Sequence, residues 1–219
     1  MQYHKIQSVW KRDPENNFKT FLRGDFSRPE FQTLWNADWE FTEKVDGTNI
    51  RIIWVPGDGL TLGGKTDRAQ IPGGIVKFYE DNALPQLAWF EDFFPQEYPH
   101  AIRVTLYGEG YGGKIQRGGK YREDQSVVFF DILVERENGT RFWMNRGDAY
   151  VIFDQLAFDR VPILMHGPLS RGVEICERGF ASQWGDFEAE GVIARPVTEL
   201  VNTFDERVIT KLKCADFPK

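Results

Sequence analysis

The stretch FTEKVDGTNIRIIW, residues 41–54, decides the fold because it places a charged residue, Lys44, among side chains that favour β-strands. Its second half is rich in β-branched and aromatic residues, which are enriched in strands. The Asp-Gly pair at 46–47 is a turn signal between two strand-like halves. The sequence therefore predicts paired strands at 39–43 and 48–55, joined at this turn.

Two interpretations of Lys44 are open on this stretch alone. In an extended chain, Lys44 and Asp46 project to one face, while Glu43 and Val45 project to the other. A lysine on the edge strand of a hairpin explains the pattern, because charged side chains protect exposed strand edges. The alternative is a lysine nucleophile in a pocket, and the rest of the chain must distinguish the two.

The composition indicates a globular protein with a sizeable core. The 219 residues are 41% hydrophobic and 15% aromatic, which excludes a largely disordered chain. A net charge of -6 argues against a surface coated with nucleic-acid-binding charge, but it allows a local basic groove. No apolar run reaches the roughly 18 residues of a membrane span, and the N-terminus does not resemble a signal peptide. Cys176 and Cys214 lack nearby metal ligands, so reduced thiols in a cytoplasmic protein are expected.

The remaining chain predicts strands interrupted by helices. A helical apolar pattern covers 75–94, with a break expected at Pro85, and a second helix is predicted at 145–158. Further strand-like runs are found at 101–113, 125–136, 190–196 and 207–213. Since the elements do not alternate regularly as strand, helix, strand, the pattern favours an α+β single domain.

Polar residues interrupt several of the predicted strands, and this recurrence is the main indication of a functional site. One such residue is usually surface-facing, but a set on different strands is harder to explain in that way. Lys211 and Lys213 are two apart on a strand, so both ammonium groups can face one anion. The interrupting residues are Lys44, Glu109, Asp131, Glu190, Lys211 and Lys213.

These residue types suit attack of a lysine on the α-phosphate of a nucleoside triphosphate. The attacking amine must be neutral, and partial burial with neighbouring cations favours the neutral form. Attack gives a lysyl-nucleotide and releases pyrophosphate. An acidic residue such as Glu190 can hold the divalent metal that the triphosphate needs, directly or through water. Glu109 can accept hydrogen bonds from ribose hydroxyls, and Phe130 can stack on the base.

The sequence resembles the covalent nucleotidyltransferase superfamily, which contains DNA ligases, RNA ligases and mRNA capping enzymes. Six short stretches occur in the order of its motifs I, Ia, III, IIIa, IV and V. DNA ligases and capping enzymes generally carry arginine five residues after the lysine, whereas Asn49 in the GTN form is typical of the RNA ligase 2 family. Small phage-type RNA ligases are similar in RDPE (12–15) and in the loop at 63–72. The six stretches are EKVDGTN (43–49), GGKTD (63–67), LYGEGYG (106–112), VFFDI (128–132), EGVIAR (190–195) and TKLK (210–213).

The resemblance implies a fold and an extent. The fold would be a single α+β nucleotidyltransferase domain, an ATP-grasp-like ligase adenylation domain, with antiparallel sheets around a nucleotide cleft. It would span residues 1–219, and because the chain ends six residues after Lys213, no separate C-terminal domain is expected. If the protein is phage-encoded, the host cytoplasm is its expected location.

The resemblance also implies a role for each matched residue. Lys44 would be the adenylated nucleophile, and Asn49 would act near the RNA end after adenylation. Two departures from the family are Lys65, where arginine is usual, and Arg195, where lysine is common. Both keep the charge, so altered rather than abolished activity is expected. The other roles are nucleotide-pocket lining for Glu43 and Asp46, ribose binding for Glu109, adenine stacking for Phe130, metal-dependent chemistry for Glu190, and α-phosphate binding for Lys211 and Lys213.

RNA binding is predicted at the basic loop 114–122, KIQRGGKYR, which carries Lys114, Arg117, Lys120 and Arg122. Phosphate contacts and base stacking would suit this loop, but a solvated glycine-rich hairpin explains it equally well. A weaker second candidate is the group of Lys11, Arg12, Arg23 and Arg28.

The resulting hypothesis is an ATP-dependent RNA ligase for RNA repair, which joins 5′-phosphate and 3′-hydroxyl ends with Mg2+ or Mn2+. It would act through a lysyl-AMP intermediate and an adenylylated RNA end. Asn49 speaks against the alternatives of a DNA ligase and a GTP-using capping-type enzyme. A non-catalytic RNA-end-binding module is the alternative from another class. The sequence leaves open the oligomeric state, and whether the RNA is nicked duplex, single-stranded or a tRNA.

Overall fold

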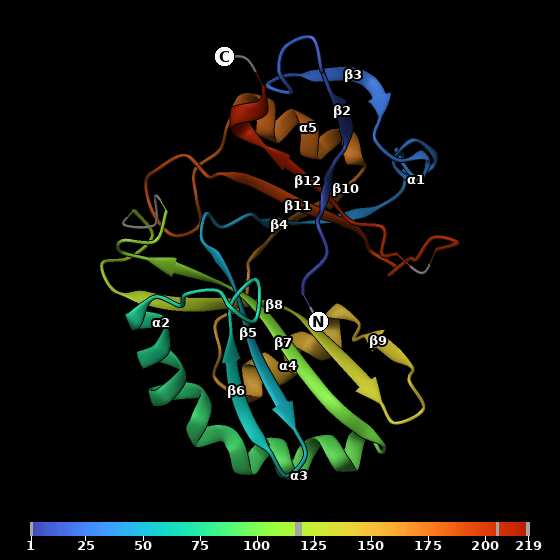
Figure 1. Ribbon diagram of the computed structural model, residues 1–219. Helices are drawn as coiled ribbons and strands as arrows, with labels where there is room; N and C mark the ends of the chain where they lie inside the picture. The colour runs from blue at the N-terminus through green and yellow to red at the C-terminus, as the bar shows by residue number, and fades with distance from the viewer. Residues whose placement is uncertain (1, 117–119, 205, 218–219) are drawn as a thin grey trace. The chain divides into compact units, whose positions relative to one another are not determined.

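The computed structural model describes residues 2–116, 120–204 and 206–217, and its chain divides into two compact units (Figure 1). The first unit comprises Met1–Tyr3 and Asp46–Arg160, and the second comprises His4–Val45 and Val161–Lys219. This division rests on contacts within each unit, so the expectation of one domain over residues 1–219 stays a prediction. Within the described residues, no helix is both long and apolar enough to cross a membrane.

The first unit is built on a five-stranded antiparallel sheet with the order β6-β5-β7-β8-β9. Along β5, the buried side chains Ile50, Ile52 and Trp54 alternate with residues that face the other side of the sheet. This period of two places one apolar face against the core. The strands are β5 (Thr48–Val55), β6 (Gly59–Gly63), β7 (Ala101–Gly112), β8 (Gln125–Arg136) and β9 (Arg141–Trp143).

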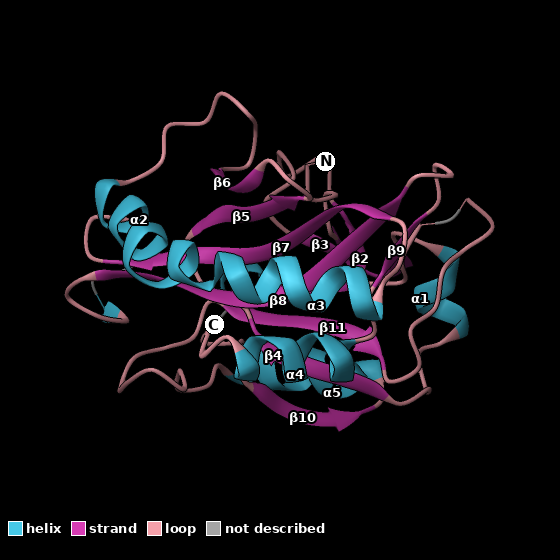
Figure 2. Ribbon diagram, turned by 90° about the horizontal axis from the view of Figure 1, so that it is seen from below, coloured by secondary structure: helices cyan, strands magenta, loops and turns pink. Residues whose placement is uncertain are grey.

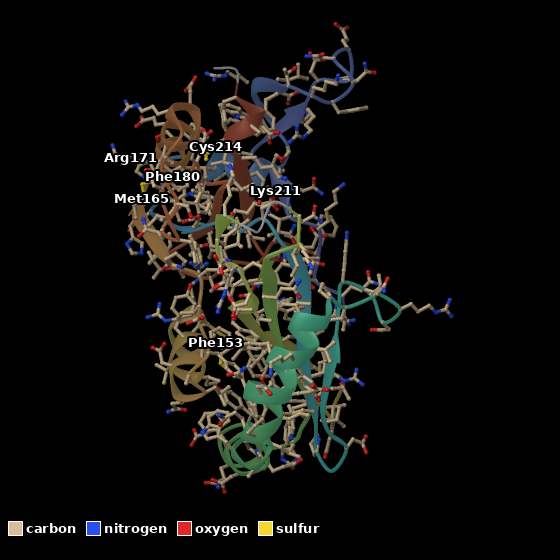
Figure 3. All side chains as sticks on the ribbon, turned by 90° about the vertical axis from the view of Figure 1, so that its left-hand side faces the viewer. Phe153, Met165, Arg171, Phe180, Lys211 and Cys214 are labelled. Carbon is tan, nitrogen blue, oxygen red and sulfur yellow. The ribbon has the colours of Figure 1, made fainter. Side chains whose placement is uncertain are left out.

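Helices pack on the apolar face of this sheet (Figure 2). Phe153 of α4, which is labelled in Figure 3, is one example. Its ring lies against that of Phe129 of β8, with ring centroids 5.4 Å apart. The predicted helix at 145–158 is confirmed as α4, and the Asn145 side chain caps it by accepting a hydrogen bond from the Asp148 amide at 2.9 Å. The helical elements are α2 (Gly73–Phe78), a π-helical turn η1 (Tyr79–Ala83), a 3-10 turn η2 (Leu84–Gln86), α3 (Leu87–Glu97) and α4 (Arg146–Gln155).

Pro85 does not end the predicted helix at 75–94. The chain instead changes helix type on either side of it, from α to π to 3-10 and back to α. Pro85 lies at the start of the 3-10 turn, where its missing N–H removes little hydrogen bonding. The proline therefore changes the helix locally without terminating it.

The second unit is built on a five-stranded sheet with the order β1-β12-β11-β4-β10, and a two-stranded ribbon, β2-β3. All neighbours in the larger sheet are antiparallel except β1 and β12. Helix α5 packs closely on this sheet, because a Cβ on Gly172 would lie 2.3 Å from the Phe41 ring. The elements are β1 (Gln7–Ser8), β2 (Trp10–Arg12), β3 (Phe21–Phe26), α1 (Pro29–Thr33), β4 (Trp39–Glu43), β10 (Ile163–Gly167), α5 (Leu169–Arg178), β11 (Gly191–Pro196), β12 (Thr210–Lys213) and a 3-10 turn η4 (Cys214–Asp216).

The predicted hairpin around 46–47 is wrong. Strand β4 pairs with β10 and β11 in the second unit, whereas β5 pairs with β6 and β7 in the first. Residues 44–47 are thus a connection between two sheets, and Lys44 lies directly after β4 rather than inside a strand. Both edges of each strand are occupied by other partners, and long-range pairing overrides the local turn signal.

Candidate active site

Lys44 is held at the point where three strands of the second unit end or begin. Its backbone N–H donates to the Gly191 carbonyl at 2.9 Å, which extends the β4–β11 pairing by one residue. Glu190 directly precedes β11, and its carbonyl accepts from the Cys214 amide at 2.9 Å, just after β12. The ends of β4 and β12 and the start of β11 therefore converge.

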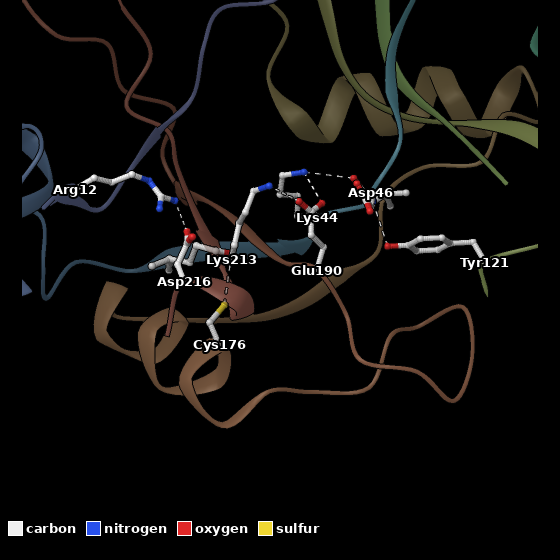
Figure 4. A network of polar contacts seen from close by, with 10 residues as sticks. Arg12, Lys44, Asp46, Tyr121, Cys176, Glu190, Lys213 and Asp216 are labelled. Carbon is white, nitrogen blue, oxygen red and sulfur yellow. Dashed lines mark hydrogen bonds and ion pairs between the residues drawn. The ribbon is translucent and has the colours of Figure 1, made fainter. Parts of the chain in front are cut away.

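The Glu190 carboxylate is shared by two lysines at this point (Figure 4). Lys44 Nζ lies 2.5 Å from Oε2 of Glu190, and Lys213 Nζ lies 2.7 Å from Oε1. All three side chains are partly exposed, at 21%, 35% and 15% for Lys44, Lys213 and Glu190. Three residues that are far apart in the sequence are thus brought together, as predicted.

Lys211 adds a further positive charge to this group. The pattern of β12 buries Thr210 and Leu212 and leaves Lys211 and Lys213 half-buried, which confirms that the two lysines share a face. Burial, helped by the charges of Lys213 and Lys44, lowers the pKa of Lys211. We call Lys44, Lys211 and Lys213 the lysine cluster. Three ammonium groups gathered around the shared Glu190 carboxylate are suited to bind an anion.

Glu43 faces away from Lys44 and is almost fully buried, at 1% exposure. It accepts hydrogen bonds from the Ser182 hydroxyl at 2.6 Å and the Gln183 amide at 2.8 Å. Burial raises its pKa, although these two hydrogen bonds oppose the shift. Glu43 thus anchors the segment that leads to Glu190, and the role of Ser182 in this contact was not predicted from the sequence.

In the first unit, the turn at 46–47 packs closely against β7. A Cβ on Gly47 would lie 2.2 Å from the Gly110 carbonyl oxygen and 2.8 Å from Cγ of Glu109. The Asp46 amide donates to the Tyr121 hydroxyl at 3.1 Å (Figure 4). Glycine is therefore required by space at position 47, and Tyr121 fixes the backbone just before it.

Asn49 and Glu109 are opposite each other on β5 and β7, on the sheet face away from the core. Oδ1 of Asn49 is buried and has no hydrogen-bond partner among the described residues. A buried amide oxygen without a partner is unusual in a folded protein. The arrangement therefore leaves an acceptor for a group from outside the protein, beside the half-buried Glu109.

Phe130 is displayed by a β-bulge. Tyr107 pairs with Asp131 and Gly108 pairs with Phe129, so Phe130 is the extra residue of β8. A bulge changes the direction in which side chains point. Here Phe130 is half-buried and lies outside the regular alternation of core-facing side chains along β8. Tyr3 packs against Phe130 edge-on, with ring centroids 5.2 Å apart, and its hydroxyl donates to the Asp131 carboxylate. No sequence signal marks Tyr3, which is brought here only by the tertiary fold.

The remaining predicted residues differ in their surroundings. Lys65 is exposed on the loop after β6. In the basic loop, Lys114 and Lys120 are exposed, Arg122 is paired with Asp124 at 2.5 Å, and Arg117 lies outside the described residues. Arg195 is buried and lies 3.7 Å from Glu199.

The second basic group is largely neutralised by carboxylates. Each of its members forms an ion pair, which weakens it as a site for phosphate. The pairs are Lys11–Asp25 at 2.7 Å, Arg12–Asp216 at 2.5 Å, Arg23–Glu177 at 2.6 Å and Arg28–Glu206 at 2.5 Å.

A divalent cation fits Glu190 by the chemistry of its donor atoms. Carboxylate oxygens suit hard cations, and Mg2+ usually binds one or two carboxylates together with water and substrate phosphates. Among the described residues, there is no group of three or more His, Cys, Asp or Glu side chains that could hold a metal ion. A cation shared with a bound polyphosphate is therefore the arrangement that Glu190 supports.

Comparison with known proteins assigns the family. A profile of the RNA ligase family matches residues 37–213. The chain belongs to the RNA ligase family. This match spans both units and includes all the predicted site residues, from Glu43 to Lys213. No curated protein sequence matches the chain significantly.

Solved structures of an RNA ligase from Naegleria gruberi share the fold of this family member. The structure with PPi superposes with a TM-score of 0.66 at 16% identity and covers 97% of this chain and 56% of that chain. A variant with ATP and Mn gives 0.66 at 15%, and another with AMP and Mn gives 0.65 at 15%, with the same coverage. The chain thus spans little more than half the length of these structures. The predicted α+β nucleotidyltransferase fold is confirmed, with sheets that are antiparallel apart from the β1–β12 pair.

Proposed function

We propose that the protein is an ATP-dependent RNA ligase that joins a 5′-phosphate to a 3′-hydroxyl. The observation that carries this proposal is the lysine cluster, in which Lys44 and Lys213 share the Glu190 carboxylate at 2.5 and 2.7 Å. A structural ion pair needs one cation for one carboxylate, whereas two lysines share this carboxylate and their charges also act on Lys211. Binding of a triphosphate would place negative charge beside these ammonium groups.

In the first step, Nζ of Lys44 attacks the α-phosphorus of ATP. A phosphorus–nitrogen bond forms, the bond to the β-phosphate oxygen breaks, and pyrophosphate leaves. Lys211 and Lys213 hold the α-phosphate and stabilise the charge that develops on its oxygens. A divalent cation at Glu190 would supply further charge neutralisation of the phosphates. Lys44 attacks as the neutral amine, and the proton that it gives up passes to solvent, to which its side chain is partly exposed.

Other residues hold the nucleoside. Glu109 accepts hydrogen bonds from the ribose hydroxyls, and Phe130 stacks on the adenine. Asp46 lines the nucleotide site, whereas the buried Glu43 supports it through Ser182. Lys65 contacts a phosphate as a point charge.

In the later steps, AMP passes from Lys44 to the RNA 5′-phosphate, and the 3′-hydroxyl then displaces AMP. Asn49 is proposed to act after adenylation, where its unpartnered Oδ1 could accept a hydrogen bond from the 3′-hydroxyl of the RNA end. The basic loop 114–122 is the proposed contact for the RNA backbone, through Lys114 and Lys120. Family membership supports RNA as the substrate, and the N. gruberi structures with ATP and Mn support the nucleotide and the metal.

The test is transfer of label from α-labelled ATP or GTP to the protein, with Mg2+ or Mn2+, on a denaturing gel. Lys44→Ala should abolish labelling from ATP, whereas Lys19→Ala, which removes an exposed lysine, should not. Thermal unfolding of both variants shows whether they are folded. Labelled protein is then mixed with 5′-phosphorylated RNA or DNA ends.

Three outcomes contradict the proposal. Absence of label with every nucleotide and metal would indicate a non-catalytic RNA-end-binding module. Label from GTP alone would indicate capping-type chemistry. Transfer of AMP to DNA ends and not to RNA ends would indicate a DNA ligase.

A further inference from the structure

Arg51 is a buried charged residue for which the proposed mechanism has no role. It lies on β5, two residues after Asn49 and on the same face of the sheet, and is 1% exposed. An arginine cannot lose its charge in a protein, so its burial requires partners for the guanidinium group. Those partners show what the residue does.

Two partners of the Arg51 guanidinium lie on the loop that follows β6. Nε donates to the Gly64 carbonyl at 2.7 Å, and a terminal nitrogen donates to Oδ1 of Asp67 at 2.8 Å. The guanidinium also lies over Gly63, where an added Cβ would be 3.1 Å from its nitrogen. Arg51 thus holds the loop at two points, on either side of Lys65.

The exposure of Asp67 indicates that its contact with Arg51 holds the loop in place and does not contribute to packing of the core. The Asp67 side chain is 89% exposed, so it adds no apolar packing. Arg51 lowers the pKa of Asp67, which keeps the carboxylate charged. The loop is further tightened by a turn in which the Ala69 amide donates to the Thr66 carbonyl at 3.1 Å. Lys65 lies on this short, fixed loop, and its side chain is exposed to solvent.

We propose that Arg51 is a positioning residue, which holds loop 64–67 through Gly64 and Asp67 so that Lys65 meets a phosphate group of the substrate. The inference rests on the proposed function, because it needs a phosphate ligand. That phosphate belongs to ATP or to the RNA 5′ end. A flexible lysine is a poor substitute for a rigid guanidinium, and a fixed loop reduces the entropy lost when Lys65 binds.

Asp67→Asn tests the proposal because positioning and simple electrostatics predict opposite effects on phosphate binding. It keeps the size of the side chain and removes a negative charge from an exposed position. If the loop were unimportant, loss of a negative charge near a phosphate site would leave phosphate binding unchanged or make it stronger. If Arg51 positions Lys65 through Asp67, binding weakens instead. We expect the KM for ATP in lysyl-adenylate formation, or the RNA concentration for half-maximal AMP transfer, to rise roughly fivefold or more.

The double variant separates positioning from a general loss of stability. In a Lys65→Ala background, Asp67→Asn should have no further effect on the affected constant, because the residue being positioned is gone. Asp58→Asn is the matched control, since Asp58 is an exposed aspartate in the β5–β6 turn. It should leave both constants unchanged.

The assays with ATP and with RNA show which phosphate Lys65 binds, and every other outcome overturns the proposal. A rise in the ATP arm assigns Lys65 to the nucleotide, and a rise in the RNA arm assigns it to the 5′ end. Unchanged or lower constants in both arms overturn the inference, as does an equal loss in the Lys65→Ala background. Since wild-type protein must first form the lysyl-adenylate, failure of the proposed function is seen separately, before any variant is compared.

Discussion

Gly47→Ala tests whether the close approach of the 46–47 turn to β7 is needed for catalysis. The added Cβ would lie 2.2 Å from the Gly110 carbonyl oxygen, whereas ordinary contacts begin at 3.4 Å. The Gly110 carbonyl belongs to the backbone of β7 and cannot easily move. The added Cβ would also lie only 2.8 Å from Cγ of Glu109. The turn must therefore move away by about 1 Å, a displacement that can reduce rates by about 100-fold when it affects reacting groups.

The expected result is a loss of both activity and stability. Asp46 and the connection to Lys44 move with the turn, so single-turnover formation of the lysyl-adenylate should fall about 100-fold. Overpacking of this kind costs about 1–3 kcal/mol of unfolding free energy. For a chain of this size, each kcal/mol lowers Tm by roughly 2–4 °C. Labelling with α-labelled ATP measures the first effect, and calorimetry measures the second.

Gly73→Ala is the control for adding a methyl group. Gly73 opens α2, and nothing lies within 4 Å of an added Cβ. Alanine favours helix over glycine by up to about 1 kcal/mol, so this variant should be as stable as wild type or slightly more stable. If Gly47→Ala forms the adenylate within about threefold of wild type at an unchanged Tm, the reasoning on close packing is refuted.

Two further predictions concern the lysine cluster. Lys213→Met should reduce the rate of adenylate formation by about 100–1,000-fold in single-turnover assays, because an ammonium group proposed to stabilise the transition state is lost. Lys77→Met, at an exposed lysine paired with Asp81, should have no effect, and equal losses in both variants would contradict the assignment. The lowered pKa of Lys211, caused by burial and by Lys213 and Lys44, predicts that kcat/KM for ATP falls as pH rises through a value below the ordinary 10.5, since the charged form binds phosphate. Lys211→Arg should move this fall to higher pH, and an unchanged profile would contradict the role of Lys211. The unfolded chain binds more protons in that range, so Lys211 itself makes folding more favourable as pH rises there.

The residues of the candidate active site were predictable because the proposed chemistry is encoded in short motifs. Lys44, Glu190 and Lys213 converge as the motifs imply, and Lys211 shares a face with Lys213 because strand periodicity is local. The long strands β7 and β8 were also evident, since β-branched and aromatic residues dominate them. Local pattern is sufficient where an element is long and its periodicity is clear.

The pairing of β4 could not be predicted, because its partners lie far away in the chain. Glu43 pairs with Val192 in β11, whereas the turn signal at 46–47 describes only its immediate neighbours. Likewise, Tyr3 reaches Phe130, and Arg51 reaches Asp67, only through tertiary contacts. Neither composition nor periodicity indicates such contacts, because they depend on how side chains pair in the folded protein.

The bulge at Phe130 separates the residue proposed for base stacking from the residues of β8 that build the core. Since Phe130 has no pairing partner on β7, its identity is free of the alternation that selects Phe129 and Ile132 for the core. Exchange of this one side chain changes the surface offered to a nucleobase while every strand keeps its register. At the place proposed for base stacking, this chain thus has a side chain that can be exchanged without a change of strand register.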